Sequence, residues 1–270
     1  MPMKSLRLVL PVLAALASTA LPALADPVRI VALGDSLTAG YGLAAPDGFV
    51  RRLEQALRDR GHDVVIVDAG VSGDTASDGL ARVDWSVGED ADAVIVELGA
   101  NDALRGVDPA ITRDALDRLV GRLAERGLPV LVAGMIAPPN LGAEYGKAFN
   151  PIFADVAAKH GALLYPFFLD GVAAEPGLNQ PDAIHPNAAG VAVVVTRIVP
   201  SVEALIARLP RPATQGSAPS TLPPSLALKG DTPCRDCSPA SRFPPRSASG
   251  WRFFAAACPG PAGSTARTTT

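Results

Sequence analysis

Residues 28–42 read VRIVALGDSLTAGYG and decide the fold of this 270-residue chain. The run at 28–33 is almost wholly apolar, as expected for a strand that is covered on both faces in a parallel sheet. The GDSL stretch that follows turns the strand into a helix and places Ser36 at the carboxyl end of the strand. Open α/β sheets bind their ligands at that edge. The stretch therefore predicts a βα unit with a reactive serine in a ligand site.

The chain up to residue 210 alternates strand-like and helix-like segments. Residues 191–199 are rich in β-branched side chains, but their apolar positions continue at helical spacing, so we expect one helix kinked at Pro200. Five βα units in series predict an α/β fold with a five-stranded parallel sheet. The predicted strands are 28–33, 64–67, 93–98, 130–133 and 163–165, and the predicted helices are 49–60, 75–82, 109–126, 147–160 and 187–209.

A serine hydroxyl becomes a good nucleophile only when a nearby base removes its proton. The chain has three histidines, and His185 differs from the others because Asp182 lies three residues before it. On a turn, that carboxylate can bind Nδ1 of the ring and leave Nε2 facing Ser36. His62 and His160 lack this context, and we expect both to be structural. The predicted catalytic residues are therefore Ser36, His185 and Asp182.

Two further motifs follow predicted strands and offer hydrogen-bond donors. VSGD at 71–74 follows the second strand, and GAND at 99–102 follows the third. Gly73 has no side chain to shield its backbone N–H, and Asn101 carries a neutral amide. Together with the N–H of Ser36 at the helix start, these groups predict an oxyanion hole with three donors.

The four blocks, in this order, resemble the SGNH or GDSL hydrolases, whose blocks centre on a serine, a glycine, an asparagine and a histidine. Here those residues are Ser36, Gly73, Asn101 and His185, and Asp182 matches the acid of the family. The resemblance covers about residues 28–209. Within the family, the chain looks like the periplasmic multifunctional thioesterase, lysophospholipase and arylesterase subgroup of Gram-negative bacteria. The resemblance implies a three-layer α/β/α, flavodoxin-like domain with strand order 2-1-3-4-5.

The resemblance also implies a serine esterase that hydrolyses carboxylic esters and thioesters through an acyl-enzyme on Ser36. Members of the subgroup accept thioesters, lysophospholipids and small aryl esters, so we expect a broad hydrolase for short or medium acyl chains, with no cofactor and no metal. We expect the pocket to be shaped by residues 136–145 and by the surroundings of Leu104 and Trp85, and to be lined by Leu104, Ile136 and Tyr145. The physiological substrate and the oligomeric state stay open.

Three other functions stay open as well. A carbohydrate O-acetylesterase would use the same fold and site. A metal-dependent phosphoesterase would use Asp35, Asp74, Asp102 and His185, although no further histidines join these acids and such residues more often cap helices or brace loops. A non-catalytic binding protein would keep the fold and leave Ser36 inert.

The amino-terminal residues have the pattern of a secretory signal peptide. Lys4 and Arg7 precede an apolar stretch at 8–17, and small residues at 23–25 form a cleavage site. The apolar stretch is short for a membrane span. We therefore expect a signal peptide at 1–25, a hydrolase domain at 26–210, and a periplasmic or secreted protein with no stable membrane anchor.

Residues 211–270 are rich in Pro, Ser, Ala, Thr and Arg, and predict a disordered tail or a frameshifted carboxyl end. All three cysteines, Cys234, Cys237 and Cys258, lie there, and no second pair completes a zinc site. The tail holds seven basic and two acidic residues, so the overall net charge of −3 leaves −8 before residue 211. An acidic body argues against nucleic acid as a partner and leaves a small ester or thioester as the expected one.

Overall fold

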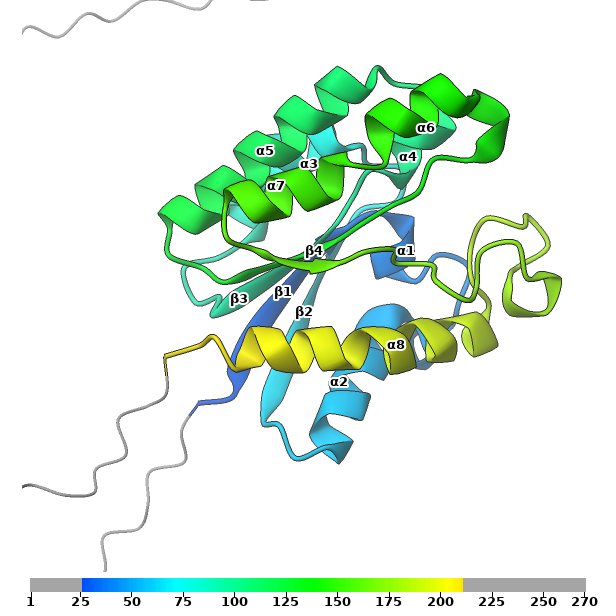
Figure 1. The fold of residues 1–270 in the computed structure, drawn as a ribbon. Helices are drawn as coiled ribbons and strands as arrows, with labels where there is room; N and C mark the ends of the chain where they lie inside the picture. The colour runs from blue at the N-terminus through cyan, green and yellow to red at the C-terminus, as the bar shows by residue number, and fades with distance from the viewer. Residues whose placement is uncertain (1–25, 211–270) are drawn as a thin grey trace, which may run out of the picture. The chain divides into compact units, whose positions relative to one another are not determined.

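The computed structural model describes residues 26–210, and Figure 1 shows their arrangement. The expected signal peptide at 1–25, the expected tail at 211–270 and the three cysteines lie outside the described residues. The expectations for those two segments therefore stay predictions.

Five strands form one sheet in the order β2-β1-β3-β4-β5, and every neighbouring pair is parallel. The expected α/β fold is confirmed, and so is the strand order that the resemblance implied. All five residues of β3 are buried, as a strand covered on both faces requires. The strands are β1 (Val28–Gly34), β2 (Val64–Gly70), β3 (Ala93–Glu97), β4 (Val130–Ala133) and β5 (Leu163–Tyr165).

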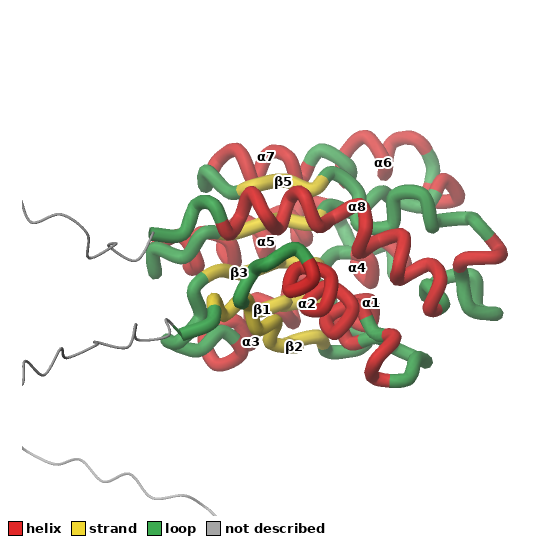
Figure 2. The backbone as a smooth tube through the Cα atoms, turned by 90° about the horizontal axis from the view of Figure 1, so that it is seen from below, coloured by secondary structure: helices red, strands yellow, loops and turns green. Residues whose placement is uncertain are grey.

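Helices cover both faces of the sheet and complete three layers (Figures 1 and 2). On one face α2 packs beside α8, and on the other α5 packs between α3 and α7. The short helices α1 and α4 begin directly after β1 and β3. The helices are α1 (Ser36–Ala39), α2 (Phe49–Asp59), α3 (Ala76–Ser86), α4 (Ala100–Leu104), α5 (Pro109–Glu125), α6 (Ala143–Phe149), α7 (Ile152–Lys159) and α8 (Ala188–Ile206).

The prediction of one helix over 147–160 is wrong. The structure has two helices there, α6 and α7, separated at Asn150 and Pro151. Pro151 has no backbone N–H to continue the hydrogen bonds of α6, and its ring crowds the preceding turn. The break frees the Asn150 side chain, whose oxygen accepts a hydrogen bond from the backbone N–H of Ala137 at 2.9 Å.

Residues 191–199 are helical, as their apolar spacing predicts, and Pro200 lies inside α8. Among the described helices, α8 alone has the length and apolar composition of a membrane span. Its buried side chains recur at helical spacing, and α8 packs against α2 and the sheet strands β4 and β5. The apolar composition of α8 is therefore explained by its place in the core of this domain.

Two substitutions in α5 test this core directly. Leu116 is 0% exposed and Ile111 is 53% exposed. Leu116→Ala should lower the free energy of unfolding by about 2–5 kcal/mol, because it removes buried methyl groups and leaves a cavity. Ile111→Ala, the control in the same helix, should change it by less than about 0.5 kcal/mol. Urea unfolding followed by circular dichroism measures both; equal losses would show that α5 does not pack as described.

Candidate active site

The candidate site lies at the carboxyl edge of the sheet, where three strands end side by side. Gly34, the last residue of β1, pairs with Gly70 of β2 and with Glu97 of β3. Ser36 and Asn101 lie in α1 and α4, which follow β1 and β3, and Gly73 lies in the loop after β2. The parallel register therefore brings the three sequence blocks to one place, as their positions after predicted strands suggested.

Ser36, His185 and Asp182 form a continuous hydrogen-bonded chain. The Ser36 hydroxyl oxygen lies 2.9 Å from Nε2 of His185, and Nδ1 of His185 lies 2.7 Å from a carboxylate oxygen of Asp182. The other carboxylate oxygen accepts hydrogen bonds of 3.0 Å from the backbone N–H groups of Ile184 and His185. These bonds, that of Ile184 foremost, lower the pKa of Asp182 to about 2. Asp182 is therefore a carboxylate at neutral pH, able to orient the His185 ring.

The turn that carries His185 is held in a strained conformation. Ala183 has a φ of 59°, in the left-handed region, which costs a residue with a Cβ about 1 kcal/mol or more. The hydrogen bonds to Asp182 hold this turn, and the backbone N–H of Gln180 donates to the His185 carbonyl at 2.7 Å. The strained residue therefore lies between Asp182 and His185, and its left-handed conformation lets the turn bring the two side chains together.

Two residues that the sequence did not single out also hold His185. The Gln180 side-chain amide donates to the carbonyl oxygens of Tyr41 at 2.7 Å and Pro186 at 3.0 Å. The Tyr41 ring lies 4.6 Å from the His185 ring, centroid to centroid. Gln180 thus ties the His185 loop to the loop after α1. Tyr41 belongs to the opening GDSL stretch, but no sequence signal marks Gln180.

Two backbone N–H groups are available as oxyanion donors. Among residues 26–210, neither the N–H of Ser36, at the start of α1, nor that of Gly73 donates to a protein acceptor. Gly73 has a φ of +91°, which only glycine adopts readily, in a turn closed by the N–H of Asp74 on the carbonyl of Val71. The Arg105 guanidinium donates to the Gly73 carbonyl at 2.7 Å and so fixes the peptide of that turn.

Asn101 reaches the site, but both of its amide hydrogens have protein acceptors. Its side-chain nitrogen lies 3.0 Å from a carboxylate oxygen of Asp35 and 3.0 Å from the backbone carbonyl of Asp74. To bind Asn101, an oxyanion would have to share an amide hydrogen with one of these two acceptors or displace that acceptor. The structure thus places Asn101 where the sequence predicts it and gives it a bracing contact that the sequence did not reveal.

Asp35 caps α1 from inside the protein. One of its carboxylate oxygens accepts the N–H of Leu37 at 3.0 Å, and the other accepts the amide of Asn101. Burial raises the pKa of Asp35 from its usual 3.8 to about 6, although the bonds from Leu37 and Asn101 act in the opposite direction. The prediction that Asp35 caps a helix is confirmed.

Asp74 and Asp102, the other two acids of the metal-dependent alternative, form hydrogen bonds that brace the segments around the site. Asp74 lies 2.6 Å from Nε of Arg82, whose guanidinium also binds the Gly34 carbonyl. Asp102 accepts hydrogen bonds of 2.9 Å from the backbone N–H of Ala76 and from the Thr112 hydroxyl. Within residues 26–210, no group of three or more His, Cys, Asp or Glu side chains is arranged to hold a metal ion.

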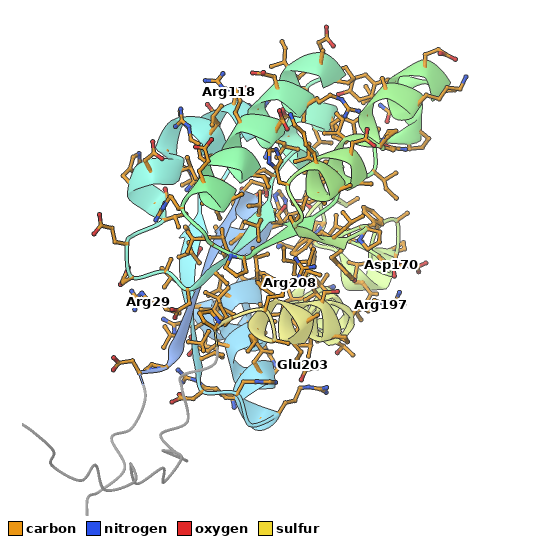
Figure 3. The ribbon with its side chains drawn as sticks, turned by 60° about the vertical axis from the view of Figure 1, so that its left-hand side comes forward. Arg29, Arg118, Asp170, Arg197, Glu203 and Arg208 are labelled. Carbon is orange, nitrogen blue, oxygen red and sulfur yellow. The ribbon has the colours of Figure 1, made fainter. Side chains whose placement is uncertain are left out.

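The other two histidines lie away from this site. Nε2 of His62 is 3.1 Å from a carboxylate oxygen of Glu203, which projects from α8 and is labelled in Figure 3. Nε2 of His160, at the end of α7, is 2.7 Å from Asp117. Each pairs with a partly buried carboxylate on a neighbouring helix, and the structural role of both stays a prediction.

A cavity of about 450 Å³ opens beside Ser36. Of the expected lining residues, Leu104 and Ile136 line it and Tyr145 does not. The Tyr145 hydroxyl instead donates to the Val107 carbonyl at 2.8 Å, and its ring stacks on Phe149. Trp85 is 74% exposed and also lies outside the lining. Other apolar residues of the wall are Met135, Pro138, Phe167, Leu169 and Ile184.

The chain is similar to known proteins in sequence and in fold. Residues 32–193 match the GDSL-like lipase/acylhydrolase family. The esterase TesA of Pseudomonas aeruginosa is 38% identical over 178 residues, which is 66% of this chain and 89% of that protein. An arylesterase of Vibrio mimicus is 34% identical over 160 residues, 59% of this chain and 80% of that one. The crystal structure of AlinE4, an SGNH-hydrolase family esterase, has 43% identity and a TM-score of 0.58, and the match covers 67% of this chain and 98% of that one.

The buried Asp35 predicts a pH dependence of stability. Because its pKa is raised in the folded protein, the carboxyl favours folding below its usual pKa of 3.8 and loses that contribution as the pH rises through about 6. Between about pH 4 and pH 7 the wild type should lose up to about 3 kcal/mol of unfolding free energy relative to Asp35→Asn, which cannot titrate. Urea unfolding of both proteins across this range measures the difference. Parallel curves would contradict the buried, shifted carboxyl.

Proposed function

The chain belongs to the GDSL-like lipase/acylhydrolase family and is a hydrolase of ester bonds, and we propose that Ser36 is its nucleophile. His185 is the general base and acid, and Asp182 orients His185. The observation that carries these roles is the unbroken chain of contacts from Asp182 through His185 to the Ser36 oxygen, 2.7 Å and 2.9 Å long. This is the geometry that an activated serine requires.

The reaction proceeds through an acyl-enzyme. His185 takes the proton of Ser36 as the serine oxygen bonds to the carbonyl carbon, and then passes that proton to the departing alcohol or thiol. Water next attacks the acyl-enzyme while His185 accepts its proton, and Ser36 recovers its hydrogen as the acid leaves. The ionised Asp182 stabilises the positively charged His185 ring during both steps.

The oxyanion that forms in each step binds the N–H groups of Ser36 and Gly73. Neither N–H donates to another acceptor within residues 26–210, so both are free to donate to it. Asn101 supplies a third donor by sharing the hydrogen that otherwise binds the Asp74 carbonyl. This contact joins Asn101 to the reacting centre without loss of its bond to Asp35.

The substrate is an ester or thioester with a short or medium acyl chain, or an aryl ester. The apolar wall of the cavity, which includes Met135, Phe167 and Leu169, supports this class, because burial of each CH₂ group contributes about 0.8 kcal/mol. A carbohydrate O-acetylesterase is less well supported, since the polar side chains of the wall are few. We propose that the chain acts on such small molecules after export, as the pattern at residues 1–25 predicts.

The first test of the nucleophile uses Ser36→Ala with p-nitrophenyl acetate and p-nitrophenyl octanoate. The substitution should lower the rate by at least about 10³-fold, because nothing replaces the serine oxygen. A fluorophosphonate should inactivate the wild type, and a metal chelator should leave its rate unchanged. Activity that survives Ser36→Ala and disappears with the chelator would instead favour the metal-dependent alternative.

The second test concerns the third oxyanion donor. Asn101→Ala should lower kcat on the order of 100-fold, with little change in KM, because the lost contact forms mainly in the transition state. Asn140→Ala is a matched control, since Asn140 is exposed and lies outside the cavity lining. Steady-state kinetics on p-nitrophenyl acetate measures both. Full activity of Asn101→Ala would show that Asn101 is not an oxyanion donor and only holds its contacts with Asp35 and Asp74.

A further inference from the structure

A buried acid that the proposed mechanism does not use contacts the turn that carries Ser36. Glu97, the last residue of β3, is 0% exposed. One of its carboxyl oxygens accepts a hydrogen bond of 2.7 Å from the Thr38 hydroxyl and a longer one of 3.4 Å from the backbone N–H of Asp35. Glu97 thus contacts the turn at 34–38 on both sides of Ser36.

The space between Glu97 and this turn is filled. Gly34 lies opposite Glu97 in the sheet register. A Cβ at Gly34 would overlap the Thr38 hydroxyl and lie 2.6 Å from the nearer Glu97 oxygen. The turn can therefore approach Glu97 only because Gly34 has no side chain.

The surroundings of Glu97 disfavour a negative charge. Its second carboxyl oxygen has no hydrogen-bond partner in the described structure. The nearby acid is Asp35 on the turn, and Thr38 on α1 presents a neutral hydroxyl. Arg82 of α3 binds Gly34 and Asp74 rather than Glu97, and Ala133, the β4 partner of Glu97 in the register, is apolar. Burial, and secondly the charge of Asp35, raise the pKa of Glu97 well above its usual value.

We propose that Glu97 is a positioning residue, an uncharged carboxyl that fastens the nucleophile turn through Thr38 and the N–H of Asp35. The inference rests on the proposed role of Ser36. A neutral carboxyl can hold both donors with its carbonyl oxygen, and avoids the cost of an unpaired charge in the interior. Ser36 then keeps its oxygen near His185 and its N–H toward the oxyanion, which affects the transition state more than substrate binding.

The test compares three variants. Glu97→Gln keeps the shape and a neutral acceptor, so its kcat should stay within about threefold of the wild type, whereas Glu97→Leu should lose about 10-fold or more in kcat with KM within about twofold. Thr38→Val removes the other end of the contact and should lower kcat in the same direction. Thr196→Val, at an exposed threonine of α8, is the matched control and should leave kcat unchanged.

An infrared difference spectrum of wild type against Glu97→Gln at neutral pH tests the charge independently of activity, and should contain the C=O band of a protonated carboxyl. A carboxylate band instead, or a kcat of Glu97→Gln as low as that of Glu97→Leu, would overturn the uncharged role. Unchanged kcat in both Glu97→Leu and Thr38→Val would overturn the positioning role. If the wild-type activity did not depend on Ser36, the proposed function and this role would fail together, while the infrared band would still report the charge of Glu97.

Discussion

The structure depends on a close approach of backbone at the carboxyl edge of the sheet, where β1 ends between β2 and β3. A Cβ at Gly70 would lie 2.9 Å from the carbonyl oxygen of Asp35, which is closer than real contacts allow. A Cβ at Gly34 would likewise lie only 2.6 Å from a carboxyl oxygen of Glu97. Because neither glycine has a side chain, the turn that carries Ser36 can pack directly against the strand ends.

The same residue type has different roles in this site because the surroundings differ. Asp182 is partly exposed and accepts several hydrogen bonds, so its pKa falls to about 2 and it stays charged beside His185. Asp35 is buried, and burial raises its pKa to about 6. One aspartate is therefore suited to stabilise a positive ring, and the other to cap α1 and bind Asn101.

The sequence predicts the sheet and the pairing of Asp182 with His185 because both depend on local patterns. Short apolar runs identify the strands, and the three-residue spacing of Asp182 and His185 brings them together on one turn. The break at Pro151 is also local, because a proline has no N–H to continue the helix. The turning of Tyr145 away from the cavity and the contacts of Glu97 depend instead on tertiary packing. Only the fold shows which neighbours those side chains meet, and no periodicity in the sequence encodes them.

If the acyl group passes through Ser36, the covalent acyl-enzyme can be trapped during turnover. The protein is mixed with p-nitrophenyl octanoate, quenched in acid during turnover, digested and analysed by mass spectrometry. We predict an octanoyl group on the peptide that contains Ser36, and its absence from the same peptide of His185→Ala, which lacks the base. An octanoyl adduct on another residue instead would show that the acyl group does not pass through Ser36.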